Sequence, residues 1–130
     1  MTQIFPSWAD VAPTLIAVAA GREAADRVFQ NCNLVNVQTR EVLDGWQVAI
    51  AKGRFAYIGP DASHCIGDET HVFDVDGRYL IPGLCDGHMH IESGMLTPAE
   101  FSAAVIPHGT TTMFTDPHEI ANVLGLEGVR

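Results

Sequence analysis

The sequence predicts an α/β fold in three parts, because the pattern of apolar residues changes twice along the chain. Residues 8–28 carry an apolar stripe with helical spacing, residues 29–79 form short apolar runs between turn signals, and residues 80–115 read as strand, helix and strand. A crossover of this length between two strands indicates a βαβ unit and a parallel sheet. We therefore expect a helical segment over residues 1–29, a small β-sandwich over 30–79 and the first βαβ part of a parallel barrel over 80–130.

The first segment is expected to form a helix that packs on the rest of the protein or on another subunit. Gly21 offers a stop for this helix, whose apolar stripe consists of Ala9, Val11, Leu15, Ile16, Val18 and Ala19. The apolar run over residues 11–20 contains Pro13 and is too short to span a bilayer. Because no basic residue precedes this run and Asp10 stands before it, it does not resemble a secretory signal. We therefore predict a cytoplasmic protein.

The middle segment reads as short strands spaced about ten residues apart, which favours a small β-sandwich. The runs cover residues 32–37, 46–50, 55–58 and 71–75, and the turns between them include Lys52-Gly53 and Asp76-Gly77. Its large aromatic residues are expected to lie in the core or at an interface; these are Trp46, Phe55, Tyr57 and Phe73.

The last segment is expected to begin a parallel barrel. The apolar run over residues 80–84 predicts a strand that is buried on both faces. Thr97, Pro98 and Glu100 then form a helix-start signal, with Thr97 as N-cap and Glu100 three residues after it. The β-branched run over residues 110–115 predicts the second strand, which Asp116 and Pro117 close.

Composition and charge exclude several classes of partner. With 130 residues the chain suffices for one compact domain, but a complete (β/α)₈ barrel needs about 250 residues, so any barrel here is incomplete. A net charge of −9 with a single lysine argues against binding nucleic acid polymers and against anionic membranes. Cys32, Cys65 and Cys85 lack metal-site spacing and fit reduced thiols in the cytoplasm.

His88 and His90 are the candidate metal ligands of this sequence. They are spaced by two residues, so on an extended strand both imidazoles point to the same face. Two neutral imidazoles at one strand end suit zinc, iron or manganese. The same face carries Asp86, whereas Cys85 points to the opposite face.

The surroundings of these histidines resemble the first barrel strand of the amidohydrolase superfamily, Pro-Gly-x-x-Asp-x-His-x-His, here Pro82, Gly83, Asp86, His88 and His90. More narrowly, the chain is similar to the adenine deaminase family from about Leu15 onward. The stretches that carry this resemblance are residues 21–26, 90–93, 95–98, 107–112 and, most specifically, Asp-Pro-His-Glu-Ile-Ala-Asn at 116–122. Cys85 and Gly94 depart from the family pattern, but neither is an expected ligand.

The resemblance implies the N-terminal portion of a cytoplasmic enzyme of purine salvage that hydrolyses adenine to hypoxanthine and ammonia. His88 and His90 would hold one ion of a centre that is binuclear in the complete enzyme and contains Mn, Fe or Zn. The other ligands and most of the proton-transfer groups would come from beyond Arg130. The β-sandwich would be a composite domain, completed by strands from the far end of the chain. The implied partners are a purine base and further copies of the same protein.

Four residues after the two barrel strands are candidates for substrate binding or for support of the metal ligands: Glu92, Asp116, His118 and Glu119. A structural interpretation stays open for each. Glu92 and Glu119 also suit helix starts, and Asp116 with Pro117 also suits a strand end. His64, His71 and His108 fit surface or packing positions.

Two other functions stay open at this point. One is a different amidohydrolase that cleaves a cyclic amide, because the His-x-His strand is common to the superfamily. The other is a non-catalytic fragment of such an enzyme that self-associates through exposed sheet edges.

Overall fold

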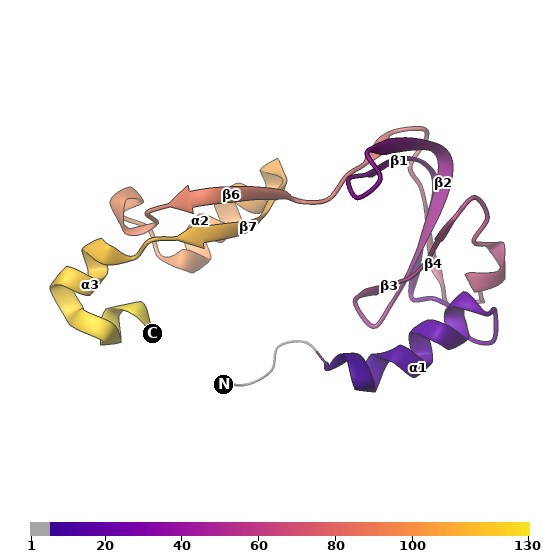
Figure 1. The fold of residues 1–130 in the computed structure, drawn as a ribbon, viewed down its shortest axis with the longest axis horizontal. Coiled ribbons are helices and arrows are strands. Elements are labelled where there is room, and N and C mark those ends of the chain that lie inside the picture. The colour runs from indigo at the N-terminus through magenta and orange to yellow at the C-terminus, as the bar shows by residue number, and fades with distance from the viewer. Residues whose placement is uncertain (1–5) are drawn as a thin grey trace. The chain divides into compact units, whose positions relative to one another are not determined.

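A computed structural model describes residues 6–130 as two compact units, one that ends at Ile81 and one that begins at Pro82 (Figure 1). The division into three parts over residues 1–29, 30–79 and 80–130 stays a prediction, and residues 1–5 of the first part lie outside the described residues. Within residues 6–130, no helix has the length and hydrophobicity that a membrane crossing requires.

The first unit begins with helix α1 (Trp8–Ala19). Ser7 and Asp10 form a reciprocal capping box at its start, which satisfies backbone N–H groups that have no partner within the helix. Pro13 is accommodated inside the helix, and the chain turns at Gly21, where φ is +67°. The helix expected from the apolar stripe is therefore confirmed over Trp8–Ala19, whereas the end of the expected helical segment is wrong because β1 begins at Arg27.

The sheet of the first unit has five strands: β1 (Arg27–Asn36), β2 (Glu41–Ala51), β3 (Arg54–Gly59), β4 (His71–Asp74) and β5 (Tyr79–Leu80). The strand order is β3-β2-β1-β4, and β5 also pairs with β1. β1 pairs antiparallel with β2 but parallel with β4 and β5. The expected runs over residues 46–50 and 55–58 lie within β2 and β3, and those over 32–37 and 71–75 each extend one residue beyond β1 and β4.

The core of the first unit lies between α1 and one face of the sheet. It is built from Val11, Leu15, Val18, Ala25, Val28, Ala49, Ala51, Ala62 and Cys65. The buried thiols Cys32 and Cys65 have raised pKa values because burial disfavours the thiolate, and neither is in a disulfide. On another part of the sheet Phe29 stacks on Phe73, with ring centres 5.1 Å apart, while Phe73 keeps 45% of its surface exposed.

The second unit contains the βαβ arrangement that the sequence predicts. β6 (Leu84–Met89) pairs parallel with β7 (Thr110–Thr115), and α2 (Pro98–Val105) lies between them in the chain. Thr97 and Glu100 form the expected capping box of α2. Short 3-10 turns cover Glu92–Gly94, Ile106–His108 and Gly125–Val129, and helix α3 (His118–Leu124) follows β7.

The strand expected from residue 80 onward begins later than the sequence pattern indicates. The apolar run over residues 80–84 is divided: Leu80 ends β5, which belongs to the first sheet, and Leu84 begins β6. Pro82 has no N–H to donate to a ladder, which explains why the run does not continue as one strand. A Cβ atom at Gly83 would overlap the Thr111 side chain, so glycine allows β7 to approach closely at this point.

Candidate metal centre

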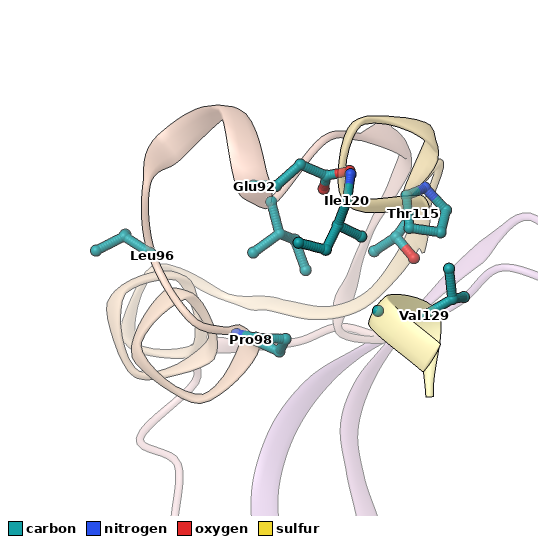
Figure 2. Close-up of a pocket in the computed structure, with 9 residues that line it drawn as sticks. Glu92, Leu96, Pro98, Thr115, Ile120 and Val129 are labelled. Atoms are coloured by element: carbon teal, nitrogen blue, oxygen red, sulfur yellow. The ribbon is translucent and has the colours of Figure 1, made fainter. Parts of the chain in front are cut away.

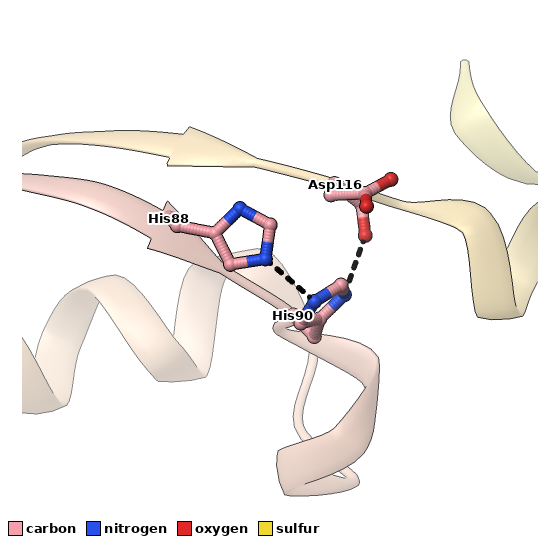
Figure 3. Close-up of side chains that lie close together, drawn as sticks. All are labelled: His88, His90 and Asp116. Carbon is pink, nitrogen blue, oxygen red and sulfur yellow. Dashed lines mark hydrogen bonds between the residues drawn. The ribbon is translucent and has the colours of Figure 1, made fainter.

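The two candidate histidines lie at the end of β6, which is where the sequence predicts them. His88 is inside the strand and His90 is the first residue after Met89. Because they alternate with Met89, their imidazoles lie on one side, and Nε2 of His88 is 2.9 Å from Nε2 of His90 (Figure 3). The backbone N–H of His88 donates to Oδ1 of Asp86 at 3.1 Å, so Asp86 shapes the backbone of this strand.

The ring of His90 is oriented from the second strand. Nδ1 of His90 lies 2.8 Å from the backbone carbonyl oxygen of Asp116 (Figure 3). Because a carbonyl oxygen only accepts, Nδ1 is the donor and carries the proton. In neutral His90 the Nε2 atom is then free of a proton, which is the form that binds a metal ion.

Asp116 and His118 extend the cluster beyond β7. Oδ2 of Asp116 lies 3.1 Å from Nδ1 of His118, and the ring of His118 meets that of His90 edge-on, with centres 4.8 Å apart. His88, His90 and Asp116 each offer a ligand atom within 4.8 Å of the others. The structure therefore brings together four of the six residues that the sequence singles out.

Glu92 and Glu119 engage backbone and loop partners. Oε1 of Glu92 accepts from the backbone N–H of Ile120 at 3.4 Å, and Oε2 of Glu119 accepts from the Ser93 hydroxyl at 2.7 Å. Hydrogen bonds from backbone N–H groups, its own first and then those of Ile120 and Glu119, hold the pKa of the Glu92 carboxyl below its usual value. Ser93 was not singled out from the sequence, because only the three-dimensional structure gives it a partner 26 residues away.

A mostly aliphatic cavity of about 280 Å³ lies beside these loops (Figure 2). It is lined by Ile91, Glu92, Leu96, Pro98, Thr115, Pro117, Ile120, Gly128 and Val129. None of the clustered histidines lines it, so the cavity is separate from the cluster of ring nitrogens.

The geometry of the two histidines fits a divalent metal ion. An ion placed about 2.0–2.1 Å from each imidazole nitrogen, the usual distance for zinc, would subtend roughly 90° between two nitrogens that are 2.9 Å apart. This angle suits common coordination geometries, and the hydrogen bond from His90 to Asp116 is the outer support that metal-binding histidines normally have. The donor set leaves further coordination positions open for other ligands and for water.

Comparisons with known proteins show what this chain is similar to. Residues 79–130, which contain β6, β7 and the histidine cluster, match the amidohydrolase family (Amidohydro_1). That segment is therefore similar to sequences of the amidohydrolase family.

Over almost its whole length the chain is homologous to part of adenine deaminases. It is 74% identical over 126 residues to the adenine deaminase of Ruegeria pomeroyi, and 74% identical over 126 residues to adenine deaminase 1 of Jannaschia sp.. Each alignment covers 97% of this chain and 21% of the relative, so the chain spans about a fifth of the length of these relatives. The resemblance that the motifs indicate is confirmed.

Among solved structures, the chain is similar to the L-hydantoinase (dihydropyrimidinase) of Arthrobacter aurescens. The TM-score is 0.54 with 24% sequence identity, over 72% of this chain and 21% of that one. Together with the family match, this likeness shows an amidohydrolase-type fold with mixed α and β content.

Proposed function

We propose that this chain supplies part of the active site of a metal-dependent adenine deaminase. The observation that carries the proposal is the convergence of His88 Nε2 and His90 Nε2 at 2.9 Å, at the end of a parallel strand, in a chain 74% identical to curated adenine deaminases. The reaction consumes adenine and water and yields hypoxanthine and ammonia, as a step of purine salvage.

His88 and His90 would hold one divalent ion, Mn, Fe or Zn, in a centre that becomes binuclear with ligands from elsewhere in the complete enzyme. When bound, the metal ion would lower the pKa of coordinated water toward about 7 and so supply hydroxide at neutral pH. His90 is oriented for metal binding because its Nδ1–H donates to the Asp116 carbonyl, which leaves Nε2 as the atom that would bind the ion. Neutral His88, which donates from Nε2 to Nε2 of His90 in this arrangement, would move its proton to Nδ1 to become a ligand.

Asp116 and His118 are proposed to face the substrate side of the centre. Their side chains are 3.1 Å apart, both are largely exposed, and the His118 ring lies beside His90. A carboxylate and an imidazole that lie this close can hold a proton between them and return it, which deamination requires at the ring nitrogen and at the leaving ammonia.

For the surroundings of the site we propose the architecture that the family resemblance implies. β6, α2 and β7 would be the first βαβ part of an amidohydrolase-type (β/α)₈ barrel, incomplete in this chain, and the five-stranded sheet would be one layer of a composite β-sandwich. The described residues contain one sheet in this region, whose exposed Phe73 is suited to contact a second layer. A cytoplasmic homo-oligomer that binds a purine base stays a prediction.

The match to adenine deaminases favours this function over another cyclic-amide amidohydrolase and over a non-catalytic fragment. The test is to measure, on one sample of the natively expressed protein, its intact mass, its metal content and adenine-dependent ammonia release. We expect about two metal ions per chain and ammonia release, both lost in His88→Asn and His90→Asn and both kept in His108→Asn. Ammonia release that survives in both ligand variants would contradict the proposal, as would a metal-loaded protein that does not act on adenine.

A further inference from the structure

The loops that follow β6 and β7 are joined by two hydrogen bonds, and in each bond a glutamate of one loop accepts from a group of the other loop. Glu92, in the loop after β6, accepts a hydrogen bond from the backbone N–H of Ile120 at 3.4 Å, and Figure 2 shows its carboxylate directed at that nitrogen. Glu119, in α3 after β7, accepts a hydrogen bond from the Ser93 hydroxyl at 2.7 Å. We call Glu92, Ser93, Glu119 and the Ile120 amide the loop clasp.

The loop clasp supplies a cap that α3 does not carry itself. Pro117 stands at the N-cap of α3 and has no side-chain group that accepts a hydrogen bond. By contrast, α1 and α2 begin with their own capping boxes. Helix N-termini leave backbone N–H groups without partners, and a side-chain acceptor usually satisfies one of them. Glu92 satisfies such a group from 28 residues away in the chain.

The residues of the loop clasp follow closely, in each loop, the two residues whose contact orients the His90 ring. Glu92 lies two residues after His90, and Glu119 lies three residues after Asp116. Between them the backbone N–H of Asp116 donates to the carbonyl of Met89 at 2.9 Å, and Nδ1 of His90 donates to the carbonyl of Asp116 at 2.8 Å. The direction of the Asp116 carbonyl depends on the backbone that follows it, and the clasp anchors that backbone at Glu119 and Ile120.

We propose that Glu92, Ser93 and Glu119 are positioning residues that hold the Asp116 carbonyl against Nδ1 of His90 and so direct the proton-free Nε2 toward the metal ion. The inference rests on the proposed function, because it assumes that His90 is a ligand. None of the three belongs to the group of ligand atoms formed by His88, His90 and Asp116, and in this inference they act through the loop that carries Asp116.

The experiment compares variants that remove a clasp contact with conservative variants that keep it. Ser93→Ala and Glu119→Ala remove the Ser93–Glu119 bond, whereas Ser93→Thr keeps the hydroxyl and Glu119→Gln keeps an acceptor. Metal affinity is measured on the natively expressed protein by competition with a chelator for Zn²⁺. Ser102→Ala is the matched control, since the Ser102 hydroxyl makes a bond of the same 2.7 Å length, to the Pro98 carbonyl within α2.

We expect Ser93→Ala and Glu119→Ala each to weaken metal binding about tenfold, the lower end of the range for outer partners of metal-binding histidines. The double variant should be no weaker than either single variant, because the two side chains share one bond. Ser93→Thr, Glu119→Gln and Ser102→Ala should bind like the parent. Hydrogen exchange at the amides of α3 should accelerate in the two alanine variants and stay unchanged in Ser102→Ala.

Three results would overturn the inference, and the first two separate it from the proposed function. If His90→Asn weakens metal binding but Ser93→Ala and Glu119→Ala do not, the clasp has no positioning role while the metal site stands. If neither His88→Asn nor His90→Asn weakens metal binding, the proposed function fails and the clasp fails with it. Strictly additive losses in the double variant would also exclude a shared role.

Discussion

The carbonyl oxygen of Asp116 accepts a hydrogen bond from Nδ1 of His90 at 2.8 Å, across 26 residues of sequence. This contact joins the ends of the two parallel strands and sets which nitrogen of His90 is free. Its acceptor is a main-chain atom, so the contact does not depend on the chemistry of the Asp116 side chain. The carboxylate of Asp116 instead contacts His118, at 3.1 Å.

Replacement of Asp116 by asparagine should therefore separate the effect of its backbone carbonyl on metal binding from the effect of its side-chain carboxylate. We expect Asp116→Asn to keep metal binding close to that of the parent, because the carbonyl that orients His90 remains. His90→Asn should weaken binding by more than about tenfold, since it removes a ligand and not merely an outer partner. The metal content of each variant after dialysis against a chelator measures these two effects. An equal loss in Asp116→Asn would show that its carboxylate is itself a ligand.

The capping box of α2 should contribute measurably to stability. The Thr97 hydroxyl accepts from the backbone N–H of Glu100 at 3.3 Å, and loss of such a cap typically costs about 1 kcal/mol. We expect Thr97→Ala to lower the free energy of unfolding by that amount and to speed hydrogen exchange in the first turn of α2. Thr97→Ser, which keeps the hydroxyl, is the control and should remain within about 0.5 kcal/mol of the parent.

The same box predicts a dependence of stability on pH. Hydrogen bonds from the Thr97 backbone N–H and then from its hydroxyl lower the pKa of the Glu100 carboxyl from its ordinary 4.5. A lowered pKa in the folded state means that the stabilisation is fully present above the pKa of the unfolded state and is lost as pH falls through the folded-state pKa. Urea unfolding at a series of pH values should show this loss in the parent. Glu100→Gln should show a smaller loss over the same acid range; an identical profile would exclude the contribution.

Gly83 should tolerate no side chain. A Cβ atom there would overlap Thr111 in β7, whereas a Cβ atom at Gly87 in β6 would meet no atom within 4 Å. We expect Gly83→Ala to cost about 1–3 kcal/mol, the usual range for overpacking. Gly87→Ala, the matched control, should cost less than about 1 kcal/mol. Thermal unfolding of the two variants makes the comparison, and equal losses would contradict the close approach of β7 to Gly83.

Phe73 offers a test of the proposed second layer over the five-stranded sheet. If other strands complete a sandwich, Phe73→Ala should cost about 3–5 kcal/mol, as a core phenylalanine does. If the sheet face stays open, the loss should be smaller, because 45% of the Phe73 surface already contacts solvent and the substitution removes its stacking on Phe29 without opening a fully buried cavity. Val28→Ala, at a fully buried position on the same sheet, provides the reference for a core substitution.

The features that the sequence predicts well depend on residues that are close together in the chain. The alternation that brings His88 and His90 to one side, the capping signal at Thr97 and the strand over residues 110–115 each depend on neighbours a few positions apart. Contacts between distant residues leave no such pattern. The Ser93–Glu119 bond, the parallel pairing of β1 with β4 and β5, and the late start of β6 after Pro82 all depend on how separate segments meet.

The cap that Glu92 supplies to α3 also has a consequence for the order of folding. An isolated helix of seven residues is far too short to be stable in water, and the start of α3 receives its side-chain acceptor from a loop 28 residues earlier. We expect α3 to remain unstructured until β6 and β7 have paired and brought that loop into place. The ordering of this helix would then be a late event, and it would report that the histidine-bearing end of the strands is already assembled.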